Sequence, residues 1–507
     1  MDRRRFIGAA AAALLGRHAV HGPVAAFAEA ARHAGAGGVA PARPSAVTLG
    51  TGAAPAAEAP APPRAHGHAA ALAGPHVQRP VPTASQLLWQ QDELALFVHF
   101  GINTFTDREW GDGREAPALF APAALDARQW ARAARAAGFR AMILTAKHHD
   151  GFCLWPTATT SHSVAASPWR GGAGDLVREF VDACRAEGLR AGLYCSPWDR
   201  NAPSYGDSPR YNDLYCDQLT ELLTRYGPIH EVWFDGANGE GPNGRRQEYD
   251  WPRFWALVRR LQPDAVIFSD AGPDVRWIGN EEGVAGDPNW STVDPATVPV
   301  PGMSGEAVMR QLQHGDRDGT VWRPGETDVS IRPGWFYHPA EDGRVRSVEN
   351  LVDLFFTSVG RNSKLLLNVP PTREGLLHET DVARLRGMRE RLDALFAEDL
   401  AAGAQRAWRV TGARTAVAEL DLGRTVRVGI ADLREDIAHG QYVARYTLEG
   451  LGDDGWTTLS RGTTVGYRKL DRLTPAAVRR VRLTIEDAVA APRPVLLRLH
   501  PPPGEAS

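Results

Sequence analysis

The 507-residue chain has few cysteines and no long hydrophobic run. Its four cysteines include no Cys-x-x-Cys pair, which argues against a zinc or redox motif, and they are too few for a disulfide framework. We expect them to be mostly small buried residues. No segment after the N-terminus has roughly 18 apolar residues in succession, so the sequence predicts no transmembrane helix.

The chain also has no excess of positive charge. It contains 57 lysine and arginine residues against 60 aspartate and glutamate residues, a formal net charge of −3. A nucleic-acid or anionic-membrane partner would require a basic excess or a polybasic run, and the sequence has neither. Only Lys147, Lys364 and Lys469 are lysines, so their positions are of interest in a chain that otherwise uses arginine.

The N-terminal segment predicts export. Arg3-Arg4-Arg5-Phe6-Ile7 fits the twin-arginine pattern, a short apolar run reaches Leu15, and Ala26-Phe27-Ala28 offers a cleavage site. We therefore expect a twin-arginine signal peptide over residues 1–28 and a mature protein in the periplasm or outside the cell. Residues 29–82 are rich in alanine, proline and glycine and cannot bury a core, which predicts a disordered linker.

Between residues 83 and 400, short apolar segments alternate with amphipathic ones. Leu94–Phe100, Ala141–Thr145 and Leu189–Cys195 have the continuous apolar character of strands buried on both faces, and helical segments such as Asp175–Glu187 lie between such strands. Eight such strands over about 300 residues predict an α/β fold, a closed (β/α)8-like barrel, in preference to an open doubly wound sheet. No glycine-rich phosphate loop follows the first strand, which weakens a dinucleotide-binding fold.

After residue 400 the pattern changes to alternation of apolar and polar residues. Thr425–Ile430 and Val478–Ile485 both alternate in this way, and the turn-forming segment Gly450–Gly455 lies between them. Residues 401–507 are therefore predicted to form a second domain, an all-β sandwich.

Polar residues lie at or just beyond the ends of five predicted strands. They are His99, Lys147–Gly151, Tyr194–Asp199, Asp235 and Arg276–Glu282. In a (β/α)8 barrel the carboxyl ends of all strands meet at one mouth, so these side chains are expected to gather there. Aromatic rings cover the apolar faces of a pyranose, and hydrolysis of a glycosidic bond needs two carboxyl groups. The pattern therefore favours sugar chemistry.

Other interpretations stay open on these residues. His148, His149 and Asp150 suit zinc or manganese and would indicate a metal-dependent barrel enzyme acting on a sugar, although neighbours on a strand point to opposite faces. Glu281 and Glu282 are also compatible with a solvated loop pair. A chain that had lost catalysis would be a non-catalytic carbohydrate-binding protein.

Four motifs together resemble the α-L-fucosidases of glycoside hydrolase family 29. They are Phe97–Gly101, Lys147–Phe152, Val232–Gly236 and Leu365–Pro371, and the resemblance covers about residues 89–396 and, more loosely, the C-terminal domain. It implies a catalytic (β/α)8-like barrel followed by a β-sandwich, a retaining mechanism, and no metal or other cofactor. By the same resemblance Asp235 is the nucleophile. The fucose pocket would be lined by His99, Glu109, Trp110, His148, His149, Tyr194 and Trp233.

A finer resemblance is to the subgroup that favours branched, α-1,3/1,4-linked fucose. It implies Glu281 as the acid/base, with Glu282 as the alternative. Arg276, Trp198 and Trp335 are further substrate-binding candidates, the two tryptophans as aromatic platforms, and the expected substrate is a fucosylated oligosaccharide or glycan. The motifs that carry this resemblance are Thr106–Gly113, Ser196–Asn201, Arg276–Glu281 and Asp328–Trp335.

Overall fold

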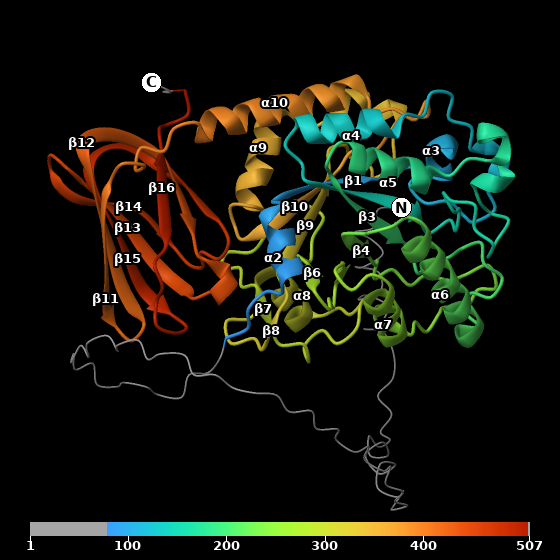
Figure 1. Ribbon diagram of the computed structural model, residues 1–507, viewed down its shortest axis with the longest axis horizontal. Coiled ribbons are helices and arrows are strands. Elements are labelled where there is room, and N and C mark those ends of the chain that lie inside the picture. The colour runs from blue at the N-terminus through green and yellow to red at the C-terminus, as the bar shows by residue number, and fades with distance from the viewer. Residues whose placement is uncertain (1–78, 505–507) are drawn as a thin grey trace, which may run out of the picture. The chain divides into compact units, whose positions relative to one another are not determined.

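The computed structural model describes residues 79–504, and eight parallel strands of this part close into a barrel (Figure 1). Their order is β1-β10-β9-β6-β5-β4-β3-β2, so the predicted (β/α)8-like barrel is confirmed. The predicted signal peptide and nearly all of the predicted linker lie outside the described residues. The barrel strands are β1 (Leu94–Val98), β2 (Ala141–Lys147), β3 (Arg190–Cys195), β4 (Glu231–Trp233), β5 (Val266–Ser269), β6 (Val275–Trp277), β9 (Gly325–Ser330) and β10 (Ser363–Asn368).

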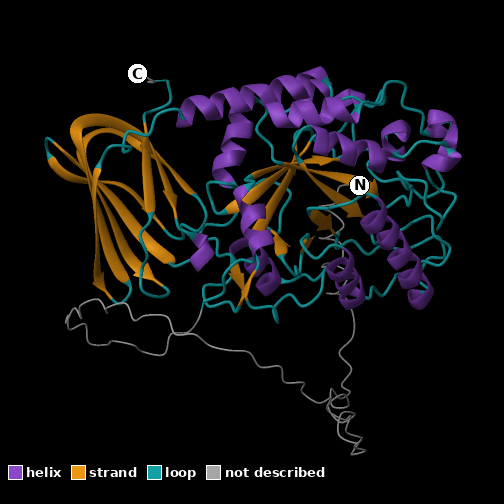
Figure 2. Ribbon diagram, in the orientation of Figure 1, coloured by secondary structure: helices purple, strands orange, loops and turns teal. Residues whose placement is uncertain are grey.

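Helices follow most of the barrel strands and lie outside them (Figure 2). The connection from β5 to β6, residues 270–274, contains no helix, so the structure departs at this point from the regular alternation of strands and helices in a (β/α)8 barrel. Among the described residues, no helix is long and apolar enough to cross a membrane. The helices are α2 (Ala84–Gln91), α3 (Ile102–Thr106), α4 (Ala127–Ala136), α5 (Leu176–Ala186), α6 (Ser208–Arg225), α7 (Trp251–Leu261), α8 (Glu306–His314), α9 (Val348–Thr357) and α10 (Glu379–Phe396).

Aspartate side chains begin three of the outer helices. Asp126, Asp175 and Asp250 precede α4, α5 and α7, and each carboxylate accepts a backbone N–H from the first turn at 2.9–3.2 Å. Such a cap satisfies one of the N–H groups that the helix leaves without a partner, and contributes roughly 0.5–2 kcal/mol. The predicted helical segment Asp175–Glu187 is thus confirmed, with its first and last residues as the two caps of α5.

Alternate residues of the barrel strands face two different apolar cores. Ala95 and Phe97 of β1 point into the barrel, whereas Leu94 and Leu96 pack in the layer between strands and helices. Because both faces are covered, a strand such as β1 is apolar at every position, which explains its unbroken hydrophobic run. All four cysteines are buried free thiols.

The N-terminal end of the barrel is filled by α2. Its Trp89 lies in the interior core, and the indole Nε1 donates to Glu231 Oε2 at 2.8 Å. Lys364 Nζ donates to the same oxygen at 3.1 Å. Burial and the nearby Glu231 raise the pKa of Glu326 well above its ordinary value. These interactions occupy the end of the barrel opposite the mouth.

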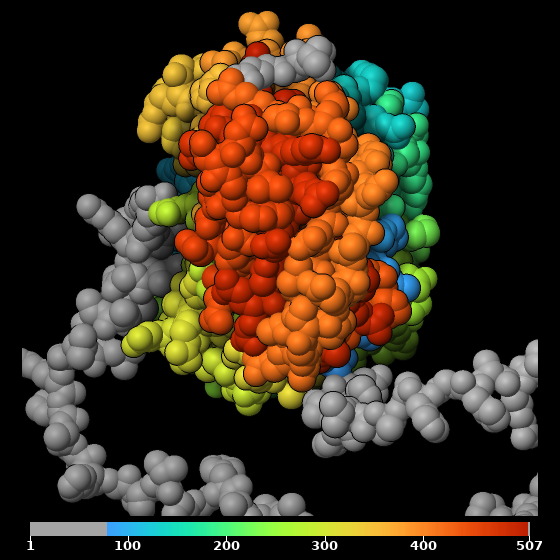
Figure 3. Space-filling view, turned by 90° about the vertical axis from the view of Figure 1, so that its left-hand side faces the viewer, coloured from blue at the N-terminus to red at the C-terminus, as the bar shows by residue number. Residues whose placement is uncertain are grey.

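The C-terminal domain consists of six antiparallel strands, and the predicted all-β domain is confirmed. Hydrogen bonds join the strands in one sheet, and register shifts within the long β12 and β15 bend it around a separate apolar core. Figure 3 shows this domain from outside, in orange and red. Its strands are β11 (Gln405–Gly412), β12 (Thr415–Arg434), β13 (Val443–Gly452), β14 (Gly455–Gly462), β15 (Lys469–Ala488) and β16 (Leu496–His500).

Strand β15 carries much of the contact between this sheet and the barrel. Lys469 Nζ lies 2.5 Å from Asp287 Oδ2, and Arg472 pairs with Asp353 of α9 at 2.6 Å. Between them, Leu470 is buried in the same apolar cluster as the barrel helices. Leu470 therefore extends the apolar cluster of the barrel into the C-terminal domain, beside that domain's own core.

Candidate active site

The carboxyl ends of β1, β2, β3 and β4 bring most of the predicted site residues to one mouth. His99 follows β1, and its ring centroid lies 5.5 Å from that of His148, which follows β2. The His148 ring in turn stacks on Tyr194 of β3 at 5.8 Å, and the Tyr194 hydroxyl reaches Asp235, two residues beyond β4. Side chains that are far apart in the sequence thus form one continuous polar and aromatic surface.

Asp235 is the buried carboxylate of this mouth, with a side chain only 4 % exposed. Its Oδ2 accepts the Tyr194 O–H at 3.0 Å and lies 3.9 Å from His149 Nε2, while Oδ1 accepts the backbone N–H of Ala237 at 2.8 Å. Donors thus face both carboxylate oxygens. They orient the carboxylate and stabilise its negative charge in a place from which water is largely excluded.

The hydrogen bonds of Ser196 determine which nitrogen of His149 carries the proton. The Ser196 hydroxyl donates to the Trp198 carbonyl at 2.8 Å, so the same hydroxyl oxygen must accept from His149 Nδ1, 2.7 Å away. In the neutral ring this leaves Nε2, the nitrogen nearer Asp235, as a hydrogen-bond acceptor. His149 can therefore accept a substrate hydroxyl through Nε2.

Asn368, the last residue of β10, orients His99 in a similar way. The Asn368 Nδ2 group donates to Ser330 Oγ at 2.9 Å and to the Trp335 carbonyl at 2.8 Å, so its Oδ1 is the acceptor that faces His99 Nδ1 at 2.8 Å. The Nδ1–H tautomer of His99 follows, with Nε2 again left as an acceptor. Two histidines of the mouth thus have the same tautomer.

Aromatic side chains line the mouth on two sides. On one side Trp233 stacks on Phe268 at 4.0 Å and lies 5.2 Å from Tyr194. On the other side Trp198 lies 4.9 Å from the His149 ring and 5.8 Å from Trp110. Apolar rings beside hydrogen-bonding groups are what a pyranose ring requires of its site.

Glu109 reaches the mouth from the loop after α3, where it holds the loop that follows β9. One oxygen, Oε1, accepts the backbone N–H of Trp335, and the other accepts the N–H of Phe336 at 3.3 Å. The Trp335 ring lies 5.0 Å from the His99 ring, and its indole Nε1 points to Glu281 Oε2 at 3.4 Å. The predicted residues Glu109, Trp335 and Glu281 are thus part of the same assembly.

Glu281 and Glu282 have different surroundings. The side chain of Glu281 is half-buried and contacts the Trp335 indole, whereas Glu282 is exposed. The backbone N–H of Glu282 donates to Asn280 Oδ1 at 3.0 Å, so Asn280 shapes the turn itself. Of the two carboxylates, Glu281 is the one that the structure connects to the aromatic mouth.

Arg276 does not reach the mouth, which corrects its prediction as a substrate-binding residue. Val275 and Trp277, its neighbours in β6, face the barrel interior, so the strand alternation turns Arg276 outward. Its guanidinium donates to the carbonyls of Leu312 and Arg323 and to Asn289 Oδ1 at 2.7 Å. Arg276 therefore fastens α8 and the adjacent loops to the barrel.

His148 and His149 do not point to opposite faces, which corrects the expectation for neighbours on a strand. Strand β2 ends at Lys147, so both histidines follow it, and their ring centroids lie 4.1 Å apart in the mouth. Asp150 belongs to the next turn, where its Oδ1 accepts the N–H of Phe152 at 2.7 Å and burial raises its pKa to about 7. Within residues 79–504, no three His, Cys, Asp or Glu side chains are grouped to hold a metal ion.

Two residues that shape the mouth, Asn368 and Asp328, were not predicted as site residues. Asn368 lies in the Leu365–Pro371 motif and hydrogen-bonds to His99, whereas Ser196, which hydrogen-bonds to His149, belongs to the segment expected at the mouth. Asp328 of β9 accepts the Trp277 indole N–H at 2.7 Å. Side chains alternate between the two faces of a strand, and this alternation places Asp328 on the inner face of β9. The same two-residue periodicity in the sequence could have identified Asp328 as a residue of the mouth.

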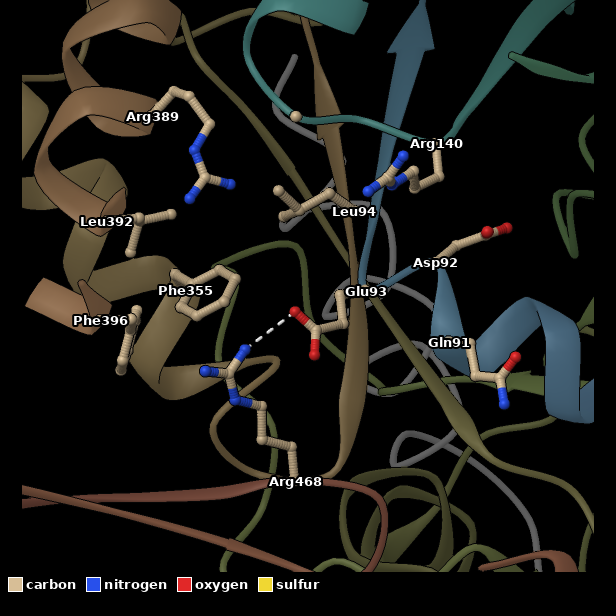
Figure 4. Close-up of a pocket in the computed structure, with 11 residues that line it drawn as sticks. Gln91, Asp92, Glu93, Leu94, Arg140, Phe355, Arg389, Leu392, Phe396 and Arg468 are labelled. Carbon is tan, nitrogen blue, oxygen red and sulfur yellow. Dashed lines mark hydrogen bonds and ion pairs between the residues drawn. The ribbon is translucent and has the colours of Figure 1, made fainter. Parts of the chain in front are cut away.

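A cavity of about 330 Å³ lies away from this mouth, where β1 begins (Figure 4). Its lining includes Glu93, Arg389 and Phe396, but none of the predicted site residues. The Glu93 carboxylate is paired with Arg468 at 2.9 Å. Because barrel active sites lie at the carboxyl ends of the strands, the mouth and not this cavity is the candidate site.

Comparison with known proteins gives consistent matches. A family model described as Alpha-L-fucosidase matches residues 103–394. The chain is 41 % identical over 442 residues to Alpha-L-fucosidase 1 of Arabidopsis thaliana, covering 82 % of this chain and 86 % of that protein. Among solved structures, a glycoside hydrolase 29 family member from an unknown rumen bacterium aligns with a TM-score of 0.78 and 40 % identity, covering 85 % of this chain and 78 % of the other. A GH29 fucosidase of Ruminococcus gnavus, in complex with fucose, aligns with a TM-score of 0.74 and 31 % identity over 83 % of this chain and 95 % of that one.

Proposed function

The chain belongs to glycoside hydrolase family 29 and is an α-L-fucosidase, and from this premise we propose that it is a retaining exo-enzyme for α-1,3- and α-1,4-linked fucose. The observation that carries the catalytic part of the proposal is the buried Asp235 carboxylate, held by Tyr194 and Ala237 in an aromatic-lined mouth. A fucosylated oligosaccharide or glycan is the substrate class.

The proposed reaction has two displacements. Asp235 attacks the anomeric carbon of fucose, the glycosidic C–O bond breaks, and Glu281 gives its proton to the departing oxygen. A water molecule then loses a proton to Glu281 and attacks the anomeric carbon, which releases fucose and restores Asp235. The contact between Glu281 and the Trp335 indole supports Glu281 over Glu282 as the acid/base.

Fucose recognition is proposed for the histidines and aromatic rings around Asp235. His99 and His149 present Nε2 acceptors to sugar hydroxyls, and Trp233 offers a flat surface for the apolar face of the ring. The Ruminococcus gnavus fucosidase, whose structure contains fucose, shares this fold over most of the chain and supports a fucose site here. Trp198 and Trp335 are proposed as platforms for the second branch of the glycan.

The linkage preference is tested by four substrates assayed in parallel. We expect 3-fucosyllactose and a Lewis trisaccharide to be cleaved well, and 2′-fucosyllactose poorly, because the two platforms suit a branched rather than a linear leaving group. An aryl fucoside serves as the control for basic activity. Equal or faster cleavage of 2′-fucosyllactose would reject the linkage preference without affecting the assignment as a fucosidase.

Export through the twin-arginine route is proposed from Arg3 and Arg4 and the apolar run that follows them. Replacing both arginines by lysine should retain the protein in the cytoplasm, because this route discriminates the arginine pair from other basic residues. Immunoblotting of cell fractions measures the distribution. Unchanged export of the double variant would indicate a signal of another type.

A further inference from the structure

His338 joins two loops of the mouth that are far apart in the sequence. Its Nε2 lies 3.0 Å from Glu109 Oε2, and its Nδ1 lies 2.9 Å from Asp107 Oδ1. Asp107 and Glu109 belong to the loop after α3, and His338 ends the loop that runs from β9 through Trp335. One imidazole ring thus bridges two carboxylates across the rim of the site.

The geometry requires this imidazole to be charged. A neutral imidazole has one donor and one acceptor nitrogen. The lone pair of the acceptor nitrogen would then point at a carboxylate oxygen, and the two would repel each other. The hydrogen bonds to Glu109 and Asp107 raise the pKa of His338 to about 9, against the opposing effect of burial. Two further charges lie near the cluster: Glu341, which also favours the cation, and Arg373, 4.0 Å from Asp107.

Glu109, the partner of His338, is the residue that holds Trp335. The Glu109 carboxylate accepts the backbone N–H of Trp335, and Asn368 anchors the Trp335 carbonyl from the other side at 2.8 Å. The indole N–H of the same tryptophan faces Glu281 Oε2 at 3.4 Å. A chain of direct contacts therefore runs from His338 through Glu109 and Trp335 to Glu281.

We propose that His338 is a positioning residue of this active site: as a cation between Asp107 and Glu109, it fixes Glu109 and Trp335 and thereby sets the place of Glu281. This inference rests on the acid/base role proposed for Glu281. Without the cation, the carboxylates of Asp107 and Glu109 repel each other, and the loop that carries Trp335 loses one of its anchors.

A dependence on pH follows from the charge. Because the pKa of His338 is raised above its ordinary value, the cation is fully present at neutral pH and is lost as the pH rises through about 9. The contribution of the bridge to loop order is lost over the same range. The activity of the wild-type enzyme should therefore fall near pH 9, and this step in the pH profile should result from deprotonation of His338.

The test compares His338→Gln and His338→Arg with the wild-type full-length enzyme. Glutamine removes the charge, whereas arginine keeps it at every accessible pH and offers donors to both carboxylates. His439→Gln is the matched control, since His439 is exposed and pairs only weakly with Asp436, at 3.6 Å, in the C-terminal domain. For each variant, kcat and KM are measured from pH 6 to 10 on the Lewis trisaccharide and on an activated aryl fucoside, together with the melting temperature.

We expect His338→Gln to lower kcat on the trisaccharide by about 10- to 100-fold, as small misplacement of a catalytic group does, and kcat on the aryl fucoside by less. The step near pH 9 should disappear in this variant. His338→Arg should recover part of the loss and stay active above pH 9, and His439→Gln should match the wild type.

Wild-type kinetics in His338→Gln would overturn the positioning role. An unchanged step near pH 9 in His338→Gln would also overturn the positioning role. The same holds for an equal loss of kcat on both substrates together with a lowered melting temperature, because that combination indicates a residue that only stabilises the fold. Glu281→Ala, assayed beside these variants, separates the two assignments. Loss of trisaccharide turnover in Glu281→Ala upholds the acid/base role, so that unchanged kinetics in His338→Gln overturn the positioning role alone.

Discussion

Asp235→Asn is expected to lower turnover of every fucoside by about a thousandfold or more and to leave the fold intact. Asparagine has nearly the same shape, and its single amide oxygen can still accept the Ala237 N–H, whereas its Nδ2 group cannot accept the Tyr194 O–H. The amide does not form the covalent ester that the proposed mechanism needs. The measurement is kcat on an aryl fucoside, because such a substrate needs little help from the acid and so reports on the nucleophile.

Asp264→Asn is the control for this experiment. Asp264 is an exposed carboxylate that precedes β5, at the end of the barrel opposite the mouth, so its loss should change neither turnover nor melting temperature. Near wild-type turnover in Asp235→Asn would remove Asp235 from the mechanism. A large drop in melting temperature would instead assign the lost activity to unfolding.

Glu281→Ala is expected to act on natural substrates and much less on activated ones. A sugar leaving group needs a proton as the bond breaks, so turnover of the trisaccharide should fall by about 10²–10⁴-fold. An aryl group with a low pKa leaves without that proton, and added azide should partly restore turnover by attacking the fucosyl-enzyme in place of activated water. The ratio of the two kcat/KM values is the measured quantity.

Glu282→Ala is the neighbouring control. Because Glu282 is exposed and its turn is held through the backbone N–H, alanine at this position should preserve both the turn and the activity. If Glu282→Ala abolished trisaccharide turnover and Glu281→Ala did not lower it, the acid/base role would be assigned to Glu282 instead of Glu281.

Most of the mouth could be predicted because it depends on the ends of parallel strands. His99, Tyr194 and Asp235 lie at or just beyond strands whose unbroken apolar character marks them in the sequence, and closure of the barrel brings such ends together. Residue alternation within each strand then directs the side chains inward. Knowledge of where a strand ends and which face it turns inward was therefore enough for these three.

The failures came where that knowledge was missing. Arg276 was assigned to the mouth because its register in β6 was unknown. His148 and His149 lie at the mouth as expected, but they do not point to opposite faces, because β2 ends at Lys147 before both of them. His338 could not be found at all, because its partners Asp107 and Glu109 lie more than 200 residues away, and no local pattern encodes their meeting.

The three lysines illustrate an intermediate case. Their rarity pointed to special positions, and each proves to form an ion pair: Lys147 with Asp199 at 3.0 Å, Lys364 with Glu231, and Lys469 with Asp287. Lys147 and Lys364 are fully buried, where a compact ammonium can meet one carboxylate that a planar guanidinium would crowd. The sequence indicated these positions, but the partners required the fold.

Covalent trapping is the decisive experiment for the proposed attack of Asp235 on the sugar. A 2-fluoro fucosyl inhibitor with a good leaving group forms a fucosyl-enzyme that hydrolyses slowly, and proteolysis followed by mass spectrometry identifies the modified residue. We expect one fucosyl adduct per chain, on the peptide that contains Asp235. An adduct on another carboxylate, or inhibition of an active enzyme without any adduct, would contradict it.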